Sequence, residues 1–190
     1  MKNSKNTKQT KIIFNALYSP EDEIKKYTHL LEKYPKTKGF YEGRAFAYFA
    51  NREYEKALAD YTKAYEADHK NINYLYCRAD CFKALNEWGS AIKEYKKILK
   101  INDKEANAYR GIADILDNHH NNYETDELYA RSLSIKNNVE LYFTRAYQYM
   151  ARGEYRRALS DLENALQLNP KEESVLALKN IALKKIREKN

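Results

Sequence analysis

The chain has 190 residues, of which 43% are hydrophobic and 32% are charged, and its formal net charge is +7. These values suit a soluble chain with ample apolar residues for a core. The five glycines and three prolines are too few for a turn-rich all-β fold, which is therefore excluded.

The excess positive charge lies at the two ends of the chain. Residues 1–11 carry four lysines and no acid, and residues 171–190 carry six basic and three acidic residues. The segment between them is neutral, with 24 residues of each sign. A nucleic-acid groove needs a contiguous basic stripe, so we expect no nucleic-acid partner and interpret residues 1–10 as a flexible basic tail.

No segment predicts export or membrane insertion. The first residues lack an apolar signal core, and "IIFNALY" is too short to span a bilayer. Cys77 and Cys81 lie four residues apart within one expected helix, a spacing that favours neither a local disulfide nor a zinc pair. We therefore expect reduced thiols, a cytoplasmic protein and no membrane span.

Five stretches of the sequence share one pattern of apolar residues. The clearest pair is "EYEKALADYTKAYEAD" at Glu53–Asp68 and "EYRRALSDLENALQLN" at Glu154–Asn169. Further copies begin at residues 19, 87 and 121, so successive copies start 33 or 34 residues apart. Such a period is typical of a solenoid, because one unit cannot bury its apolar face alone.

The first copy belongs to a divergent N-terminal repeat at residues 11–37. Its second helix is the clearer one: Ser19 suits the N-cap, Pro20 suits the first turn, and Tyr27 lies in register. The first helix, within residues 7–17, is expected to be short or irregular.

Residues 38–71 form the first full repeat. Tyr41, Ala45 and Tyr48 follow helical spacing in its first half, and Ala57 and Tyr61 do so in its second half. The short "ANRE" turn between the halves forces the two helices to be antiparallel. Alanines between the helices allow close approach of their backbones.

Three more repeats follow, at residues 72–105, 106–138 and 139–172. Residues 72–105 carry Ile98 where the other repeats have a small residue, and residues 106–138 carry Thr125 in place of an alanine. The chain then ends in an amphipathic helix at residues 173–190, which should cap the last repeat. Its apolar stripe consists of Val175, Leu178, Ala182 and Ile186.

This pattern resembles the tetratricopeptide-repeat family. The best match is residues 139–172, with Tyr142, Ala146, Tyr149, Ala158, Leu162, Ala165 and Pro170 at the family's recurring bulky, small and proline positions. His69 stands where proline is usual in the first full repeat. The resemblance implies an all-α, right-handed superhelical solenoid of antiparallel helix pairs, with about four full repeats, a divergent N-terminal repeat and a C-terminal capping helix.

Two positions of the repeat change together. Position seven holds arginine in three repeats, and position 23 of the same repeats holds an acid. In the remaining repeat both become apolar, as Ile112 and Leu128. We therefore predict structural ion pairs between the two helices of a repeat; the alternative is that the arginines bind an anionic ligand. The pairs are Arg44–Asp60, Arg78–Glu94 and Arg145–Asp161.

The resemblance also implies where a partner would bind. In the family, the first helices of the repeats line a concave groove, and the corresponding positions here form two aromatic patches around a polar, acid-leaning middle. The alternative is that these aromatic rings fill the interior or contact a flanking segment of the same chain. The groove candidates are Glu42, Phe46, Phe49, Asn73, Tyr76, Asp80, Lys83, Arg110, Asp114, Asp117, Phe143, Tyr147 and Met150.

The sequence provides no set of residues for catalysis. The lysine and asparagine pattern with which some family members bind a chaperone's C-terminal carboxylate is absent, because those positions hold Glu42, Phe46 and Cys77. His119 and His120 lie in a turn with no ligand set around them. We expect no enzyme, no metal and no cofactor.

The sequence thus favours a cytoplasmic adaptor or scaffold that binds a peptide segment or helix of another protein in its groove. One alternative is a small repeat-type chaperone for an exported protein. Another is a module that associates with itself, as a homodimer through an end repeat, which would be sensitive to polar changes at Leu178 or Ile186.

Overall fold

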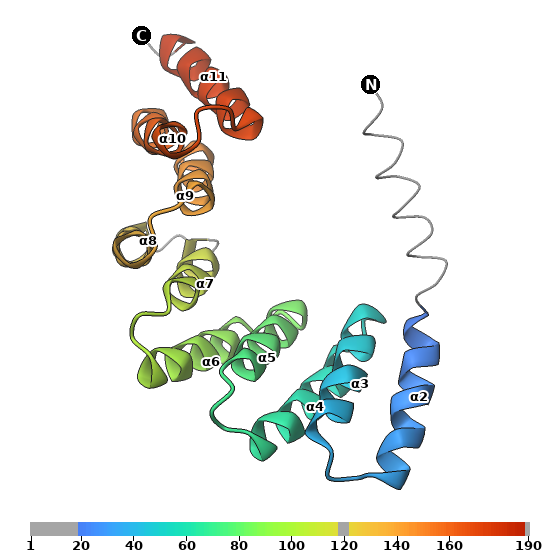
Figure 1. Cartoon of the computed structure of the whole chain (residues 1–190). Coiled ribbons are helices and arrows are strands. Elements are labelled where there is room, and N and C mark those ends of the chain that lie inside the picture. The colour runs from blue at the N-terminus through green and yellow to red at the C-terminus, as the bar shows by residue number, and fades with distance from the viewer. Residues whose placement is uncertain (1–18, 118–121, 189–190) are drawn as a thin grey trace. The chain divides into compact units, whose positions relative to one another are not determined.

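The computed structural model describes residues 19–117 and 122–188, and every regular element within these residues is an α-helix (Figure 1). The all-α prediction is therefore confirmed. The expected basic tail, the helix within residues 7–17 and the two adjacent histidines lie outside the described residues. In chain order the helices are α2 (Pro20–Lys33), α3 (Lys38–Ala50), α4 (Tyr54–Ala67), α5 (Asn73–Ala84), α6 (Trp88–Ile101), α7 (Ala106–Asp117), α8 (Asn122–Ile135), α9 (Val139–Ala151), α10 (Tyr155–Leu168) and α11 (Glu173–Glu188).

The chain divides into two compact units, with the boundary between Glu94 and Tyr95, inside α6. In the first unit α2 packs on α3, α3 on α4, and α4 on α5. In the second unit α7 packs on α8, α9 on α10, and α10 on α11. Within each unit, neighbours in sequence are therefore neighbours in space, as in a repeat array.

Helix α2 begins as its sequence predicts. The Ser19 Oγ accepts a hydrogen bond from the backbone N–H of Asp22 at 3.2 Å, and Pro20 occupies the first helical turn. Glu21, Asp22 and Glu23 place negative charge at the positive end of the helix dipole. The hydroxyl and the three carboxylates together fix the start of the first described helix.

The same turn closes three of the helix pairs. Arg52, Asn86 and Gly153 occupy position 15 of their repeats, and all three have positive φ, at 63°, 60° and 74°. Glycine adopts this conformation without strain, whereas arginine and asparagine do so at a cost of about 1 kcal/mol. The following backbone N–H donates to a carbonyl of the first helix, in Glu53–Tyr48 at 2.9 Å, Glu87–Phe82 at 2.8 Å and Glu154–Tyr149 at 2.8 Å. This hydrogen bond ends the first helix and reverses the chain.

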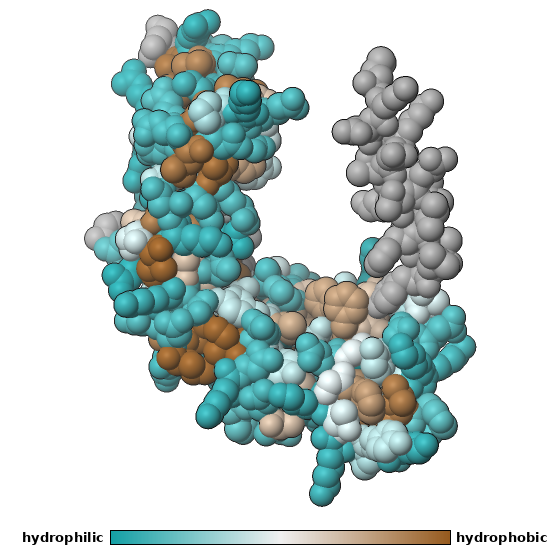
Figure 2. All heavy atoms as spheres, in the orientation of Figure 1, coloured by the Kyte–Doolittle hydropathy of each residue, from teal (hydrophilic) through white to brown (hydrophobic). Residues whose placement is uncertain are grey.

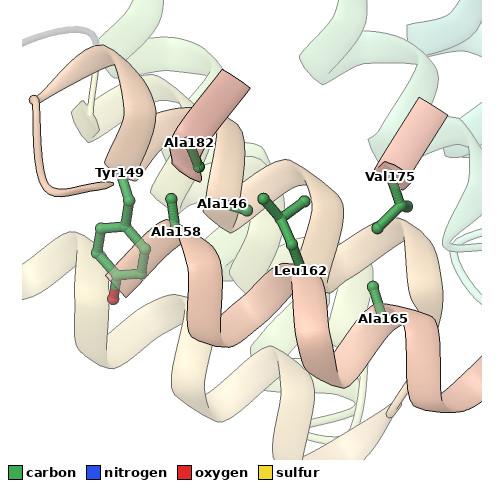
Figure 3. Close-up of a cluster of buried hydrophobic side chains, with 7 residues drawn as sticks. All are labelled: Ala146, Tyr149, Ala158, Leu162, Ala165, Val175 and Ala182. Carbon is green, nitrogen blue, oxygen red and sulfur yellow. The ribbon is translucent and has the colours of Figure 1, made fainter. Parts of the chain in front are cut away.

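The cores of the two units combine alanine with large side chains. In the first unit the buried cluster consists of Ala45, Ala57, Tyr61, Ala64, Tyr74 and Cys81. In the second unit Ala146 and Ala158 lie between α9 and α10, and Leu162 fills the space beside them (Figure 3). Alanine at the crossing point allows the backbones to approach, while the larger side chains fill the remaining volume.

Repeat 106–138 accommodates its departures from the pattern. Thr125, which replaces an alanine, has no exposed surface, and neither has Ser132. The Ser132 hydroxyl donates a hydrogen bond at 2.8 Å to the carbonyl oxygen of Ala106. That hydrogen bond satisfies a polar group in the core, so the small side chain is retained without an unpaired hydroxyl.

The C-terminal helix α11 covers α10 with the predicted stripe. Val175 and Ala182 are fully buried (Figure 3), and Leu178 packs against the same cluster. Ile186 is half-buried. Leu176 and Ile181 remain 41% and 50% exposed on the same helix, so α11 also presents apolar side chains to solvent.

Successive repeats are joined by a tyrosine at position 24. The Tyr27 ring lies over Gly43 and the Tyr95 ring over Gly111: a Cβ added to these glycines would lie 2.3 and 2.5 Å from the ring. Real Cβ atoms do not approach that closely, so the ring occupies the place of a side chain. At the equivalent joint Tyr61 contacts Cys77, and burial together with that thiol raises the pKa of Tyr61.

Candidate partner-binding site

The three arginines at position seven contact the three predicted carboxylates. The Arg44 guanidinium donates two hydrogen bonds to Asp60, at 2.6 and 2.9 Å. Arg145 likewise donates two to Asp161, both at 2.7 Å. Arg78 Nη2 lies 3.2 Å from the Glu94 carboxylate. The three carboxylate residues are each only 3% exposed, which agrees with ion pairs inside the helix pairs and leaves little room for an external anion.

In repeat 106–138 both members of this pair are apolar. Ile112 is 3% exposed, and Leu128 is half-buried. Asp114, two residues after Ile112, instead accepts a hydrogen bond from the Tyr129 hydroxyl. Burial and the Asp114 carboxylate together raise the pKa of this hydroxyl. The polar link between the helices has thus moved from an ion pair to a phenol–carboxylate hydrogen bond.

The α3–α5 face of the first unit is hollowed at the predicted groove positions. One hollow of about 520 Å³ is lined by Glu23 and Tyr27 of α2, by Gly39, Glu42, Gly43 and Phe46 of α3, and by Tyr61 and Cys77. A second hollow, of about 170 Å³, is lined by Phe46, Phe49, Tyr61, Cys77 and Asp80. The larger of the two falls within the size range of ligand pockets, roughly 300–1,000 Å³.

The α9–α11 face of the second unit carries a hollow of about 320 Å³. Its lining is Val139, Glu140, Phe143, Glu172, Ser174 and Val175. Tyr147 lies one helical turn after Phe143 and is therefore on the same side of α9. Polar residues cover most of the visible surface, with apolar areas of limited size between them (Figure 2).

The predicted aromatic residues differ in exposure. Phe49 and, in the second unit, Phe143 and Met150 pack against the core clusters and are partly buried. Phe46 and Tyr147 are both 60% exposed, although each is large and apolar. They occupy the same position, the ninth, of their two repeats. Packing therefore accounts for the first group, whereas exposure at a shared position distinguishes Phe46 and Tyr147 as candidate anchors.

The polar candidates are mostly engaged within the chain. Lys83 pairs with Asp80 at 3.3 Å, and Arg110 pairs with Glu140. Glu42 accepts a hydrogen bond from the Tyr74 hydroxyl at 3.0 Å. Asn73 is exposed and Tyr76 is half-buried.

Asp117 requires a correction, because its side chain is only 6% exposed and lies 3.7 Å from Arg152. Arg152 also pairs with Asp126 at 2.9 Å, so Asp117 belongs to a buried charge cluster and is not part of an open face. Burial raises the pKa of Asp117 despite the neighbouring guanidinium. No spacing within one repeat predicts this cluster, since it joins both helices of one repeat to the turn of the next.

Both cysteines are free thiols, as expected. Cys81 is fully buried, and burial raises its pKa to about 12. Among residues 19–117 and 122–188, no cluster of three or more His, Cys, Asp or Glu side chains could hold a metal ion. The same residues include no helix that is both long enough and apolar enough to cross a membrane.

Comparison with known proteins identifies the repeat. The tetratricopeptide-repeat family model matches residues 139–172. The chain is 36% identical to serine/threonine-protein phosphatase 5 of Rattus norvegicus over 88 residues, which are 45% of this chain and 18% of that protein. It thus spans about a fifth of the length of the curated relatives it matches.

Solved structures resemble the fold over most of its length. YrrB, described as a tetratricopeptide-repeat protein with an unusual peptide-binding site, matches with a TM-score of 0.64 and 18% identity, over 88% of this chain and 87% of that one. A thermophilic tetratricopeptide-repeat protein of Thermus thermophilus matches with a TM-score of 0.68 and 14% identity, over 95% and 98%. Residues 139–172 thus match a tetratricopeptide repeat, and the chain shares the fold of solved tetratricopeptide-repeat proteins over most of its length.

Proposed function

We propose that the chain is a non-catalytic adaptor that holds a peptide segment or helix of another protein against its first-helix faces. Proteins of this family generally mediate protein–protein interactions. The observation that carries the proposal is the exposure of Phe46 and Tyr147, each 60% exposed at the ninth position of its repeat and on a hollowed face. Aromatic side chains of this kind act as anchors when a partner desolvates them.

The rest of each face supports this role. The helix pairs are closed by hydrogen-bonded turns and internal ion pairs, so the anchors stand on a rigid scaffold and little ordering entropy opposes binding. The proposal includes a cytoplasmic location, with which the two free thiols agree. Holding a segment of an exported protein, as a small chaperone does, is a narrower form of the same activity.

The experiment is affinity capture from the source cell with the wild type and with Phe46→Ala and Tyr147→Ala, singly and combined. We expect each single change to reduce recovery of bound proteins and the double change to abolish it, with helix content unchanged by circular dichroism. Tyr34→Ala is the matched control, because Tyr34 is a 48% exposed aromatic residue at the end of α2. Equal recovery by the double variant and the wild type would contradict the proposal.

A second candidate function, self-association, is favoured by one observation. Leu176 and Ile181 are exposed on α11, whereas Leu178, which the sequence suggested for this role, packs against the core. A second copy could cover the exposed pair. Analytical ultracentrifugation should then show a dimer that Leu176→Glu and Ile181→Glu convert to monomer, while a monomeric wild type at high concentration would exclude this function.

A further inference from the structure

The three hollows share one chemical character. Their linings include the carboxylates of Glu23, Glu42 and Asp80 in the first unit, and of Glu140 and Glu172 in the second. Among the described residues that line the three, none is a lysine, arginine or histidine. The charged residues in these described linings are all acids, in a chain with 34 basic and 27 acidic residues. Three of these acids already pair with a cation within the chain, in Glu23–Lys26, Asp80–Lys83 and Glu140–Arg110.

One lining carboxylate in each unit accepts hydrogen bonds from neutral groups. Glu42 accepts its hydrogen bond from the Tyr74 hydroxyl, and Glu172 accepts from the Asn169 amide and the Ser174 hydroxyl. These donors are neutral, so they orient the carboxylate without cancelling its charge. Burial, followed by the Glu42 carboxylate, raises the pKa of Tyr74 to about 12, which is the expected effect of a nearby negative charge on a phenol.

Aromatic side chains line the same hollows as these carboxylates. Phe46 borders both hollows of the first unit, and Phe143 borders the hollow of the second. A segment with only acidic or C-terminal carboxylate groups would meet like charge here, whereas lysine or arginine stems can lie along the rings while their charged ends reach the carboxylates.

We propose that the partner segment is cationic, with lysine or arginine residues between apolar ones, and that it places its apolar side chains in the hollows and its charges on Glu42 or Glu172. This inference rests on the proposed adaptor function and names the chemical class of its partner. The overall charge of +7 works against such a partner at long range, so a preference for a cation has to come from the local carboxylates.

The test uses three fluorescein-labelled peptides that share one pattern of leucine and phenylalanine and carry lysine, glutamine or glutamate at every other position. Anisotropy titrations of the full chain should rank the lysine peptide first, about tenfold tighter than the glutamine peptide, and the glutamate peptide last. Glu42→Gln and Glu172→Gln should each weaken the lysine peptide about two- to fivefold and leave the glutamine peptide unchanged. Glu66→Gln and Glu127→Gln are the controls, because these exposed carboxylates lie on second helices.

The outcomes separate this inference from the adaptor function. Equal binding of the lysine and glutamine peptides, lost in Phe46→Ala, would overturn the cationic preference and leave the adaptor function standing. Binding of no peptide, up to about 1 mM, would overturn the inference, and the adaptor function would then stand or fall with the capture experiment.

Discussion

The Arg145–Asp161 pair can be tested in a double-mutant cycle. The double variant of that cycle has the apolar pair that another repeat of the same chain already carries. The third repeat carries Ile112 and Leu128 at the equivalent positions, so Arg145→Ile with Asp161→Leu converts one repeat to the chemistry of its neighbour. Each single change leaves the other charge without its partner, in a site where the side chains of Arg145 and Asp161 are 17% and 4% exposed.

The size of the effect follows from this burial. Removing Arg145 leaves a carboxylate that has lost both hydrogen bonds in a nearly closed site, which costs about 3–5 kcal/mol. The exposed part of the guanidinium gives water some access, so we expect the lower end, about 3 kcal/mol. The double replacement removes both charges and fills the space with apolar atoms, at a cost of about 0–1 kcal/mol. The coupling energy should therefore be at least about 2 kcal/mol.

The assay is urea denaturation followed by far-UV circular dichroism, with all four proteins at one pH and salt concentration. The dependence of the free energy of unfolding on urea should be the same in all four, so that midpoints can be compared. The reasoning is refuted if Arg145→Ile alone is no less stable than the double variant. In that case the carboxylate would need no partner, and the arginine would be free for an external anion.

Three further outcomes are expected. Gly111→Ala places a Cβ against the buried Tyr95 ring and should lower the free energy of unfolding by about 1–3 kcal/mol. Gly89→Ala, with open space around it, should raise that free energy by up to about 1 kcal/mol. Thermal unfolding measures both changes, and equal stabilisation by the two would exclude close packing of the Tyr95 ring on Gly111. Because the pKa of Asp117 is raised from its ordinary value of 3.8, the folded state holds this proton more tightly and loses stability as the pH rises above that value. The stability of Asp117→Asn relative to the wild type should therefore increase with pH, and a decrease in urea titrations would show that the pair with Arg152 dominates. Iodoacetamide should modify native Cys77 slowly and Cys81 more slowly still, since burial raises the pKa of both thiols and Cys81 is fully buried. Peptide mass spectrometry measures the labelling, and rapid labelling of Cys81 would indicate that the helix pair opens.

Features that depend on one repeat were predictable from the sequence. The helix pairs, the N-cap at Ser19 and the arginine–carboxylate pairing all follow from spacing within a unit, because position seven faces position 23 whatever surrounds the pair. A comparison of the repeats within this one chain indicated the contact, because the arginine and the acid are replaced together, by Ile112 and Leu128.

Features that depend on how one repeat sits on the next were missed. The cluster of Asp117, Arg152 and Asp126 spans two repeats, so no fixed offset within a unit reveals it. The Tyr27 ring lies over Gly43 of the following repeat, which is another contact that no spacing within one repeat reveals. Likewise, spacing placed Phe46 and Phe143 on one kind of face, but only the packing of neighbouring helices shows that Phe46 is exposed and Phe143 is partly covered.

The joint between Tyr95 and Gly111 limits how this protein can change over generations. Tandem arrays grow and shrink by duplication and loss of whole repeats, yet the space beside Gly111 is filled by a ring that belongs to the preceding repeat. Copying residues 106–138 to another place in the array would need a matching predecessor, and a substitution at either partner would favour a compensating one at the other. The two residues of such a joint are therefore expected to change together, although they belong to different repeats.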